Sequence, residues 1–207
     1  MRATHCTTAD GLRLEAEWAG PDQPRAVAVL CHPHPAFGGT MRSIVISALF
    51  EALPEHNIAC LRFNFRGVEN SQGAYDEGRA EAQDVVAAID TAAATYPGLP
   101  LTLVGWSFGA DMALTVPDER IRSWIAIAPP LRFRPAADYD IVGADARPKL
   151  LLLAEHDEFR APAEIETEVA AWQETRVEVI AGASHFFVGR TQRVVELVAR
   201  DLEGVAG

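Results

Sequence analysis

The stretch LTLVGWSFG (101–109) carries the most information about the fold of this chain. A short, largely apolar run leads directly into Gly105-Trp106-Ser107-Phe108-Gly109, and a segment of small residues follows. A Gly-x-Ser-x-Gly pattern between a buried strand and a helix predicts a sharp turn that raises the serine hydroxyl above the edge of a sheet. A plain glycine turn would have the same local sequence, so the remaining evidence must come from elsewhere in the chain.

Strand-like and helix-like segments alternate on both sides of this turn. Strands are expected at residues 10–20, 26–31, 58–65, 101–105, 123–128, 149–155 and 176–180. Helices are expected at 40–53, 79–96, from the serine turn to about 115, 161–173 and 189–203. Such alternation predicts an α/β fold with a mostly parallel central sheet and helices on both faces. Because no repeat or long linker divides residues 1–207, a single domain is expected.

Two local features refine the expected helices. Thr40 is a residue type that favours the N-cap position, so it is predicted to begin the helix that runs to about Leu53. In the helix over 79–96, helical spacing predicts one shared buried face. The residues assigned to that face are Val85, Val86, Ile89 and Ala93.

The serine of the turn needs partners, because a hydroxyl is a weak nucleophile near neutral pH unless a positioned base activates it. In sheets of this kind the partners follow in the order serine, acid, histidine, each in a loop after a later strand. Asp157 lies just past the strand 149–155, and His185 follows the strand 176–180. We therefore predict Ser107 as nucleophile, His185 as base and Asp157 as acid, with Glu155 and Glu158 as alternatives for the acid.

Two backbone N–H groups are predicted to stabilise an oxyanion. One is that of Phe108, the residue after the nucleophile. The other should come from the loop after strand 26–31, where Pro33 and Pro35 have no N–H to donate. His32 is expected to belong to the sheet ladder, which leaves His34, with Ala36 or a later residue as the alternative.

Aromatic residues flank these motifs and fit either a substrate pocket or the core, namely Phe37, Trp106, Phe186 and Phe187. The pair His32-x-His34 has no carboxylate or cysteine at a spacing that completes a metal site, so no metal is expected.

Composition limits the partners. A net charge of -11 argues against nucleic acid. The chain has no signal-peptide pattern at its start and no apolar run near the roughly 18 residues of a membrane span, so no membrane partner is expected. Three cysteines without a CxxC pair are typical of buried thiols in a reducing cytoplasm, which is the expected location. The oligomeric state is left open.

Five stretches together resemble the α/β-hydrolase superfamily: CHPHPAFGGTM (31–41), LRFNFRGVENSQGAYDEG (61–78), GWSFGA (105–110), AEHDEF (154–159) and GASHFF (182–187). More closely, the chain is similar to the small lidless bacterial hydrolases described as carboxylesterase-like or dienelactone-hydrolase-like. Dienelactone hydrolase has a cysteine nucleophile where this chain has Ser107. Within FRGVENS, Arg66 is expected to have a structural role in which its guanidinium binds loop carbonyls, with substrate binding as the alternative.

The resemblance implies a serine esterase that cleaves a small-molecule ester or thioester through an acyl-enzyme, with a Ser-Asp-His triad and no cofactor. An amidase or peptidase with the same triad is an alternative, as is a non-catalytic binding protein of the same fold. Lids of this fold usually follow the strand that here is 123–128. Residues 129–148 contain four prolines and are predicted to be a loop too short for a helical cap.

Overall fold

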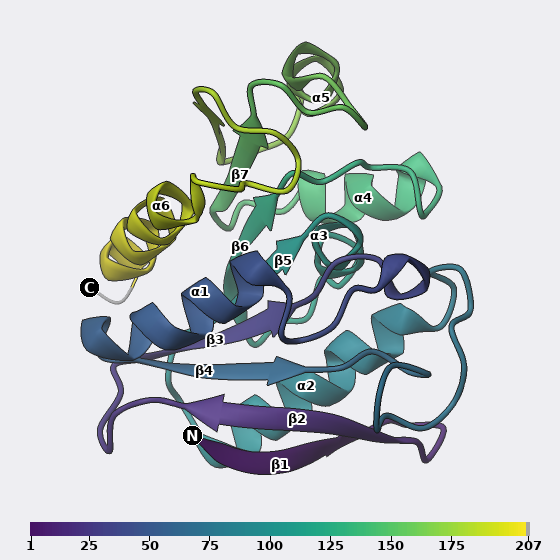
Figure 1. Cartoon of the computed structure of the whole chain (residues 1–207), viewed down its shortest axis with the longest axis vertical. Coiled ribbons are helices and arrows are strands. Elements are labelled where there is room, and N and C mark those ends of the chain that lie inside the picture. Colours follow the sequence, from purple (N-terminus) through teal and green to yellow (C-terminus); the bar gives the residue numbers. More distant parts are fainter. Residues whose placement is uncertain (206–207) are drawn as a thin grey trace.

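A computed structural model describes residues 1–205 of the chain (Figure 1). Its strands are β1 (Arg2–Thr7), β2 (Arg13–Ala19), β3 (Ala26–Cys31), β4 (Ile58–Phe63), β5 (Leu101–Trp106), β6 (Ile121–Ile127), β7 (Lys149–Ala154) and β8 (Thr175–Ile180). Its α-helices are α1 (Ile44–Ala52), α2 (Glu81–Thr95), α3 (Phe108–Ala113), α4 (Ala136–Gly143), α5 (Pro162–Glu168) and α6 (Thr191–Val205). Two short 3₁₀ helices are η1 (Pro35–Phe37) and η2 (Leu53–His56).

The strands form one sheet within the described residues, in the order β1-β2-β4-β3-β5-β6-β7-β8. From β4 to β8 in this order the neighbours pair in parallel, whereas β2 pairs antiparallel with both β1 and β4. The predicted mostly parallel sheet is therefore confirmed. Strand β1 was not predicted, because it lies at the sheet edge and has only Cys6 fully buried, so it lacks an apolar run.

Helices cover both faces of the sheet, as predicted (Figure 1). On one face, α1 and α6 pack with the sheet in one apolar core. On the other, α2, α3, α4 and α5 contribute to a second core. Strands β3, β4, β5 and β7 are buried along their whole length between these layers, which explains their apolar sequences. No helix within residues 1–205 is both long and apolar enough to cross a membrane.

Several predicted helix details were wrong. Ser43, not Thr40, is the N-cap of α1, because Thr40 belongs to a turn in which its carbonyl accepts a hydrogen bond from the Ser43 N–H. In α2, Val86 lies on the exposed side. The buried face instead follows helical spacing through Val85, Ala88, Ile89 and Ala92. Helix α5 is also shorter than the predicted span 161–173.

The segment between β6 and β7 contains a helix, α4, where only a loop was predicted. Tyr139 and Val142 of α4 are buried in the core that α2 and α3 share. Helix α4 therefore packs into the layer on one face of the sheet and does not form a separate cap. Within residues 1–205 there is no lid domain, as predicted.

Candidate active site

Ser107 occupies a strained turn between β5 and α3. Its φ is 55° and its ψ is -119°, a conformation that L residues rarely adopt. The turn is tight enough to exclude side chains on either side. A Cβ added to Gly105 would lie 2.3 Å from the Gly109 carbonyl oxygen, and a Cβ added to Gly109 would lie 2.2 Å from the Cys31 carbonyl oxygen. Glycine is therefore required at both positions, and the hydroxyl of Ser107 is held at the carboxyl end of β5.

The three residues predicted to act together lie in a continuous hydrogen-bonded chain. The His185 Nε2 lies 2.8 Å from the Ser107 Oγ, and the His185 Nδ1 lies 2.8 Å from the Asp157 Oδ2. All three side chains are almost completely buried. Because a carboxylate only accepts hydrogen bonds, Nδ1 carries the imidazole proton and Nε2 is free to accept the proton of the serine hydroxyl. This arrangement can remove a proton from Ser107 during attack on an electrophilic carbon.

Each of the three carboxylates in the loop after β7 has a different partner. Glu155 accepts a hydrogen bond from the Gly182 N–H at 2.7 Å, and Glu158 accepts one from the backbone N–H of His185 at 3.1 Å. Only the carboxylate of Asp157 contacts the imidazole ring. Its second oxygen accepts the N–H groups of Phe159 at 2.9 Å and Arg160 at 3.2 Å, which hold the carboxylate in place.

The loop of residues 32–41, after β3, runs along the same edge of the sheet. The backbone N–H groups of residues 36 to 41 all donate hydrogen bonds to acceptors within the protein, namely His34 Nδ1, the carbonyls of His34 and Pro35, Ser43 Oγ and Asn64 Oδ1. Pro33 and Pro35 have no N–H. The N–H of His34 has no acceptor among residues 1–205. Among the backbone N–H groups of residues 33–41, that of His34 is therefore the one without an acceptor in the described part of the chain.

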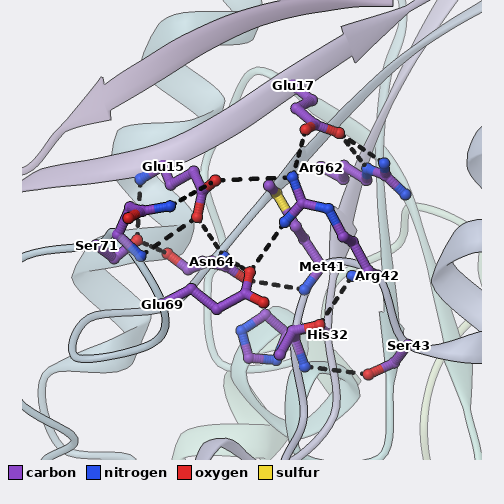
Figure 2. Close-up of polar contacts among 12 residues, drawn as sticks. Glu15, Glu17, His32, Met41, Arg42, Ser43, Arg62, Asn64, Glu69 and Ser71 are labelled. Atoms are coloured by element: carbon purple, nitrogen blue, oxygen red, sulfur yellow. Dashed lines mark hydrogen bonds and ion pairs between the residues drawn. The ribbon is translucent and has the colours of Figure 1, made fainter.

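Two consecutive residues after β4 hold the two ends of this loop. At its start, the Phe65 N–H donates to the His32 Nε2 at 3.0 Å. At its end, the Met41 N–H donates to the Asn64 Oδ1 at 2.8 Å. The amide nitrogen of Asn64 donates in turn to Glu15 and Glu69, at 2.8 and 2.7 Å (Figure 2). We call this set of contacts the Asn64–Phe65 clamp.

The two histidines of the loop have different surroundings. His32 is fully buried, and burial lowers its pKa to about 4, so the ring is neutral. Its Nδ1 lies 2.6 Å from the Pro33 carbonyl oxygen, so both ring nitrogens are engaged. The His34 ring packs among aromatic rings, and its Nε2 lies 3.0 Å from the Tyr75 hydroxyl. Since the His34 Nδ1 accepts the Ala36 N–H, its Nε2 carries the proton and donates to Tyr75.

A cavity of about 510 Å³ opens at Ser107 and His185. Phe37, Trp106 and Phe186, which were predicted to line a pocket or to lie in the core, line this cavity. Phe187 instead lies in the core beneath α6. The remaining lining residues were not predicted: Pro33, Gly38, Gly39, Ser43, Ile44, Pro130, Arg132, Phe133 and Phe159.

Among these, Phe159 packs edge-on against the His185 ring with a centroid distance of 4.6 Å. Its position two residues after Asp157 could have indicated from the sequence that it lies near the site. Residues 130–133 belong to no recognisable motif, so nothing in the sequence indicated that they line the cavity.

Arg66 has the structural role that was predicted, but with different partners. Its guanidinium binds the buried carboxylate of Asp84 on α2 at 2.7 Å and the carboxylate of Asp10 at 3.2 Å. The expected loop carbonyls are not its acceptors. The ion pair joins the loop after β4 to α2 on the side of the sheet opposite to α1.

Comparisons with known proteins agree with this fold. Residues 25–199 match a family of alpha/beta hydrolase domains. A structure of an alpha-beta serine hydrolase homologue from Coxiella burnetii is 31% identical, with a TM-score of 0.88, and the alignment covers 98% of each chain. XC6422 from Xanthomonas campestris, described as an a/b serine hydrolase without a lid, is 27% identical with a TM-score of 0.85 over 97% of this chain and 93% of that one. The uncharacterized protein RP471 of Rickettsia prowazekii is 30% identical over 190 residues, which are 87% of this chain and 80% of RP471.

Proposed function

Because this chain belongs to the alpha/beta hydrolase family and is a hydrolase, we propose that it cleaves a small carboxylic ester or thioester through an acyl-enzyme on Ser107. The observation that carries the proposal is the hydrogen-bonded chain from Ser107 through His185 to Asp157. A buried serine in this contact has the base and the orienting carboxylate that nucleophilic attack requires.

In the proposed reaction, the Ser107 Oγ attacks the carbonyl carbon of the substrate while the His185 Nε2 takes the hydroxyl proton. Asp157 stabilises the imidazolium that forms. The tetrahedral intermediate collapses to the acyl-enzyme, and His185 returns the proton to the departing alcohol or thiol. Water then attacks the acyl-enzyme, again with His185 as base, and releases the carboxylic acid and free Ser107.

Two backbone donors are proposed to stabilise the oxyanion of each intermediate. Phe108 is the first residue of α3, where a backbone N–H has no partner within the helix. His34 is supported by elimination, since the N–H groups of residues 36 to 41 are already engaged. Both residues belong to segments that meet at Ser107, and loss of one such donor typically costs a factor of about 10²–10³ in kcat.

The proposal is tested with p-nitrophenyl esters and acyl thioesters of graded chain length, together with a fluorophosphonate label. The label should attach to Ser107, as shown by peptide mapping. Ser107→Ala and His185→Ala should each lower kcat by a factor on the order of 10⁴–10⁶, because the members of such a unit are not additive. Ser47→Ala, a serine of α1 outside the cavity, is the matched control and should retain both activity and labelling. Full ester hydrolysis by Ser107→Ala would contradict the proposal.

A further inference from the structure

The cavity at Ser107 differs in charge from the rest of the molecule. The chain has 29 acidic residues against 18 lysines and arginines. No aspartate or glutamate is among the described residues that line the cavity, whereas Arg132 is. An acidic protein therefore presents its substrate with a cavity in which an arginine is the one side chain of permanent charge.

The guanidinium of Arg132 has no carboxylate partner within residues 1–205. Neighbouring arginines do have one: Arg134 pairs with Asp138 at 2.7 Å, and Arg160 pairs with Glu168. Arg132 instead lies over two aromatic rings, 5.3 Å from the centroid of Phe133 and 5.8 Å from that of Phe159. The exposed side chain of Arg132 is therefore free of a carboxylate partner within the described residues and lies beside the aromatic residues that line the cavity.

The backbone that carries Arg132 is held firmly. The buried carboxylate of Asp111 accepts the N–H groups of Leu131 at 2.9 Å, Arg132 at 2.9 Å and Phe133 at 3.2 Å. Asp111 lies on α3, one turn after Ser107, and its own N–H donates to the Ser107 carbonyl at 3.1 Å. The backbone of Arg132 is therefore fixed relative to Ser107 by a short connection through Asp111. A preorganised group loses less freedom when it binds a ligand.

Arg132 is also close to the reacting groups. The Phe159 ring that lies under its guanidinium packs against the imidazole of His185 at 4.6 Å. On the other side, burial and then the positive charge of Arg132 lower the pKa of His34. A substrate group that contacts Arg132 would therefore lie within the same cavity as its scissile bond.

We propose that Arg132 binds a carboxylate of the substrate and thereby selects anionic esters or thioesters over neutral ones. The inference rests on the proposed function of Ser107. A guanidinium presents two parallel N–H donors that match the two oxygens of a carboxylate. The Phe133 and Phe159 rings beside the guanidinium offer an apolar surface to the carbon chain that joins the carboxylate to the ester.

The kinetic test uses two matched pairs of substrates. For a carboxylate on the acyl side, the p-nitrophenyl half-ester of adipic acid is compared with p-nitrophenyl hexanoate. For one on the leaving group, 4-carboxyphenyl acetate is compared with phenyl acetate. In at least one pair, Arg132→Gln should lower kcat/KM for the anionic ester about five- to tenfold more than for the neutral ester. Arg132→Lys should give a smaller loss of kcat/KM, because lysine keeps the positive charge but lacks the two parallel N–H donors.

Arg122→Gln is the matched control. Arg122 is exposed on β6, has no ion pair within the described residues and lies outside the cavity, so this variant removes the same charge elsewhere. It should leave the anionic-to-neutral ratio unchanged. A loss of equal size in both arginine variants would assign the effect to the net charge of the protein and overturn the proposal.

A binding measurement separates this inference from the proposed function. In the Ser107→Ala background, calorimetry compares 4-phenylbutyrate with its uncharged amide. The carboxylate should bind more tightly, and the difference should disappear when Arg132→Gln is added. If wild-type protein hydrolyses no ester but this difference in binding is found, the proposed function is wrong, whereas the proposed carboxylate site at Arg132 is supported. If carboxylate and amide bind equally, and Arg132→Gln leaves the ratio of kcat/KM between anionic and neutral esters unchanged, the proposed carboxylate site at Arg132 is wrong.

Discussion

The backbone strain at Ser107 is compensated by its surroundings. A φ of 55° in a non-glycine residue costs about 1–3 kcal/mol and persists only where the surrounding structure enforces it. Here the Ser107 N–H donates to the Ile127 carbonyl of β6 at 2.8 Å, and the chain on either side is continuous with β5 and α3. The strain places the hydroxyl against His185 and so serves the proposed chemistry.

His34 offers a residue-scale test of the proposed oxyanion donor. Its φ of -55° lies within the range of proline, so His34→Pro removes the N–H without requiring a different φ. His34→Ala removes the ring and keeps the N–H. We expect His34→Pro to lower kcat by a factor of about 10²–10³ and His34→Ala to have a much smaller effect. Steady-state kinetics on a p-nitrophenyl ester measures both variants, and circular dichroism checks their folding.

Equal losses in the two His34 variants would assign the effect to the ring and its contact with Tyr75. A phosphonate adduct of Ser107 gives a direct measurement. A distance above about 3.5 Å between the phosphonyl oxygen and the His34 nitrogen would exclude a hydrogen bond.

At the scale of elements, the loop after β3 depends on the loop after β4. The Asn64–Phe65 clamp holds both ends of residues 32–41, so the N–H of His34 is positioned by a segment that is distant in sequence. Arg42 strengthens the connection through ion pairs with Glu17 at 2.6 Å and Glu69 at 2.9 Å (Figure 2). Asn64, Phe65 and Glu69, which make these contacts, all belong to the stretch 61–78 that resembles the family. The stretch supports the site without lining the cavity.

Asn64→Leu tests this dependence. Leucine has a similar size and no polar atoms, so the buried N–H of Met41 loses its acceptor. We expect the free energy of unfolding to fall by about 1–3 kcal/mol. We also expect kcat to fall while KM changes little, because the oxyanion loop shifts. Chemical denaturation and steady-state kinetics provide the two measurements.

Asn70→Ala is the matched control for Asn64→Leu. Asn70 is exposed and donates to the same Glu15 at 3.2 Å, but it contacts no part of the loop 32–41. It should change stability by less than about 0.5 kcal/mol and leave kcat as it is. A destabilised Asn64→Leu variant with wild-type kcat would show that the clamp serves stability alone.

At the scale of the whole molecule, the candidate site is open. The helix between β6 and β7 packs into the core, and no domain formed by the described part of the chain covers the cavity of about 510 Å³. We expect short and medium acyl chains to be preferred and no activation at an oil–water interface. Rates on a series of p-nitrophenyl esters and on triglyceride emulsions measure this. A marked preference for emulsified long-chain triglycerides would contradict it.

The stability of the whole molecule should depend on the buried His32. Its pKa is about 4 in the folded protein and 6.5 ordinarily, because burial disfavours the charged ring. As the pH falls from 6.5 towards 4, the unfolded chain therefore binds the proton first. The contribution of His32 is fully present above pH 6.5 and is lost through this window, by about 3 kcal/mol in total.

His32→Gln removes this titration while keeping an oxygen that can accept the Phe65 N–H. The stability difference between wild type and this variant should shrink by about 2–3 kcal/mol between pH 7 and pH 4.5. Urea denaturation at the two pH values measures it. A difference that stays constant would show that His32 is not held neutral in the folded protein.

Much of the fold follows from patterns that are local in the sequence. The apolar runs of β3, β5 and β7 and the glycines around Ser107 specify elements through contacts between near neighbours in the chain. The order of serine, acid and histidine adds the positions of the loops, because the carboxyl ends of parallel strands share one edge of the sheet. The sequence by itself thus determined the fold class, the strained turn, and the prediction of Ser107, Asp157 and His185.

Other features depend on residues that meet only after folding. Strand β1 pairs at the sheet edge and has little apolar pattern of its own. Which carboxylate of the loop after β7 reaches His185 depends on how that loop meets the one after β8. Arg132 enters the cavity because Asp111, 21 residues away in the chain, binds its backbone. Only the tertiary structure determines these features, because each depends on distances between segments that no local sequence pattern encodes.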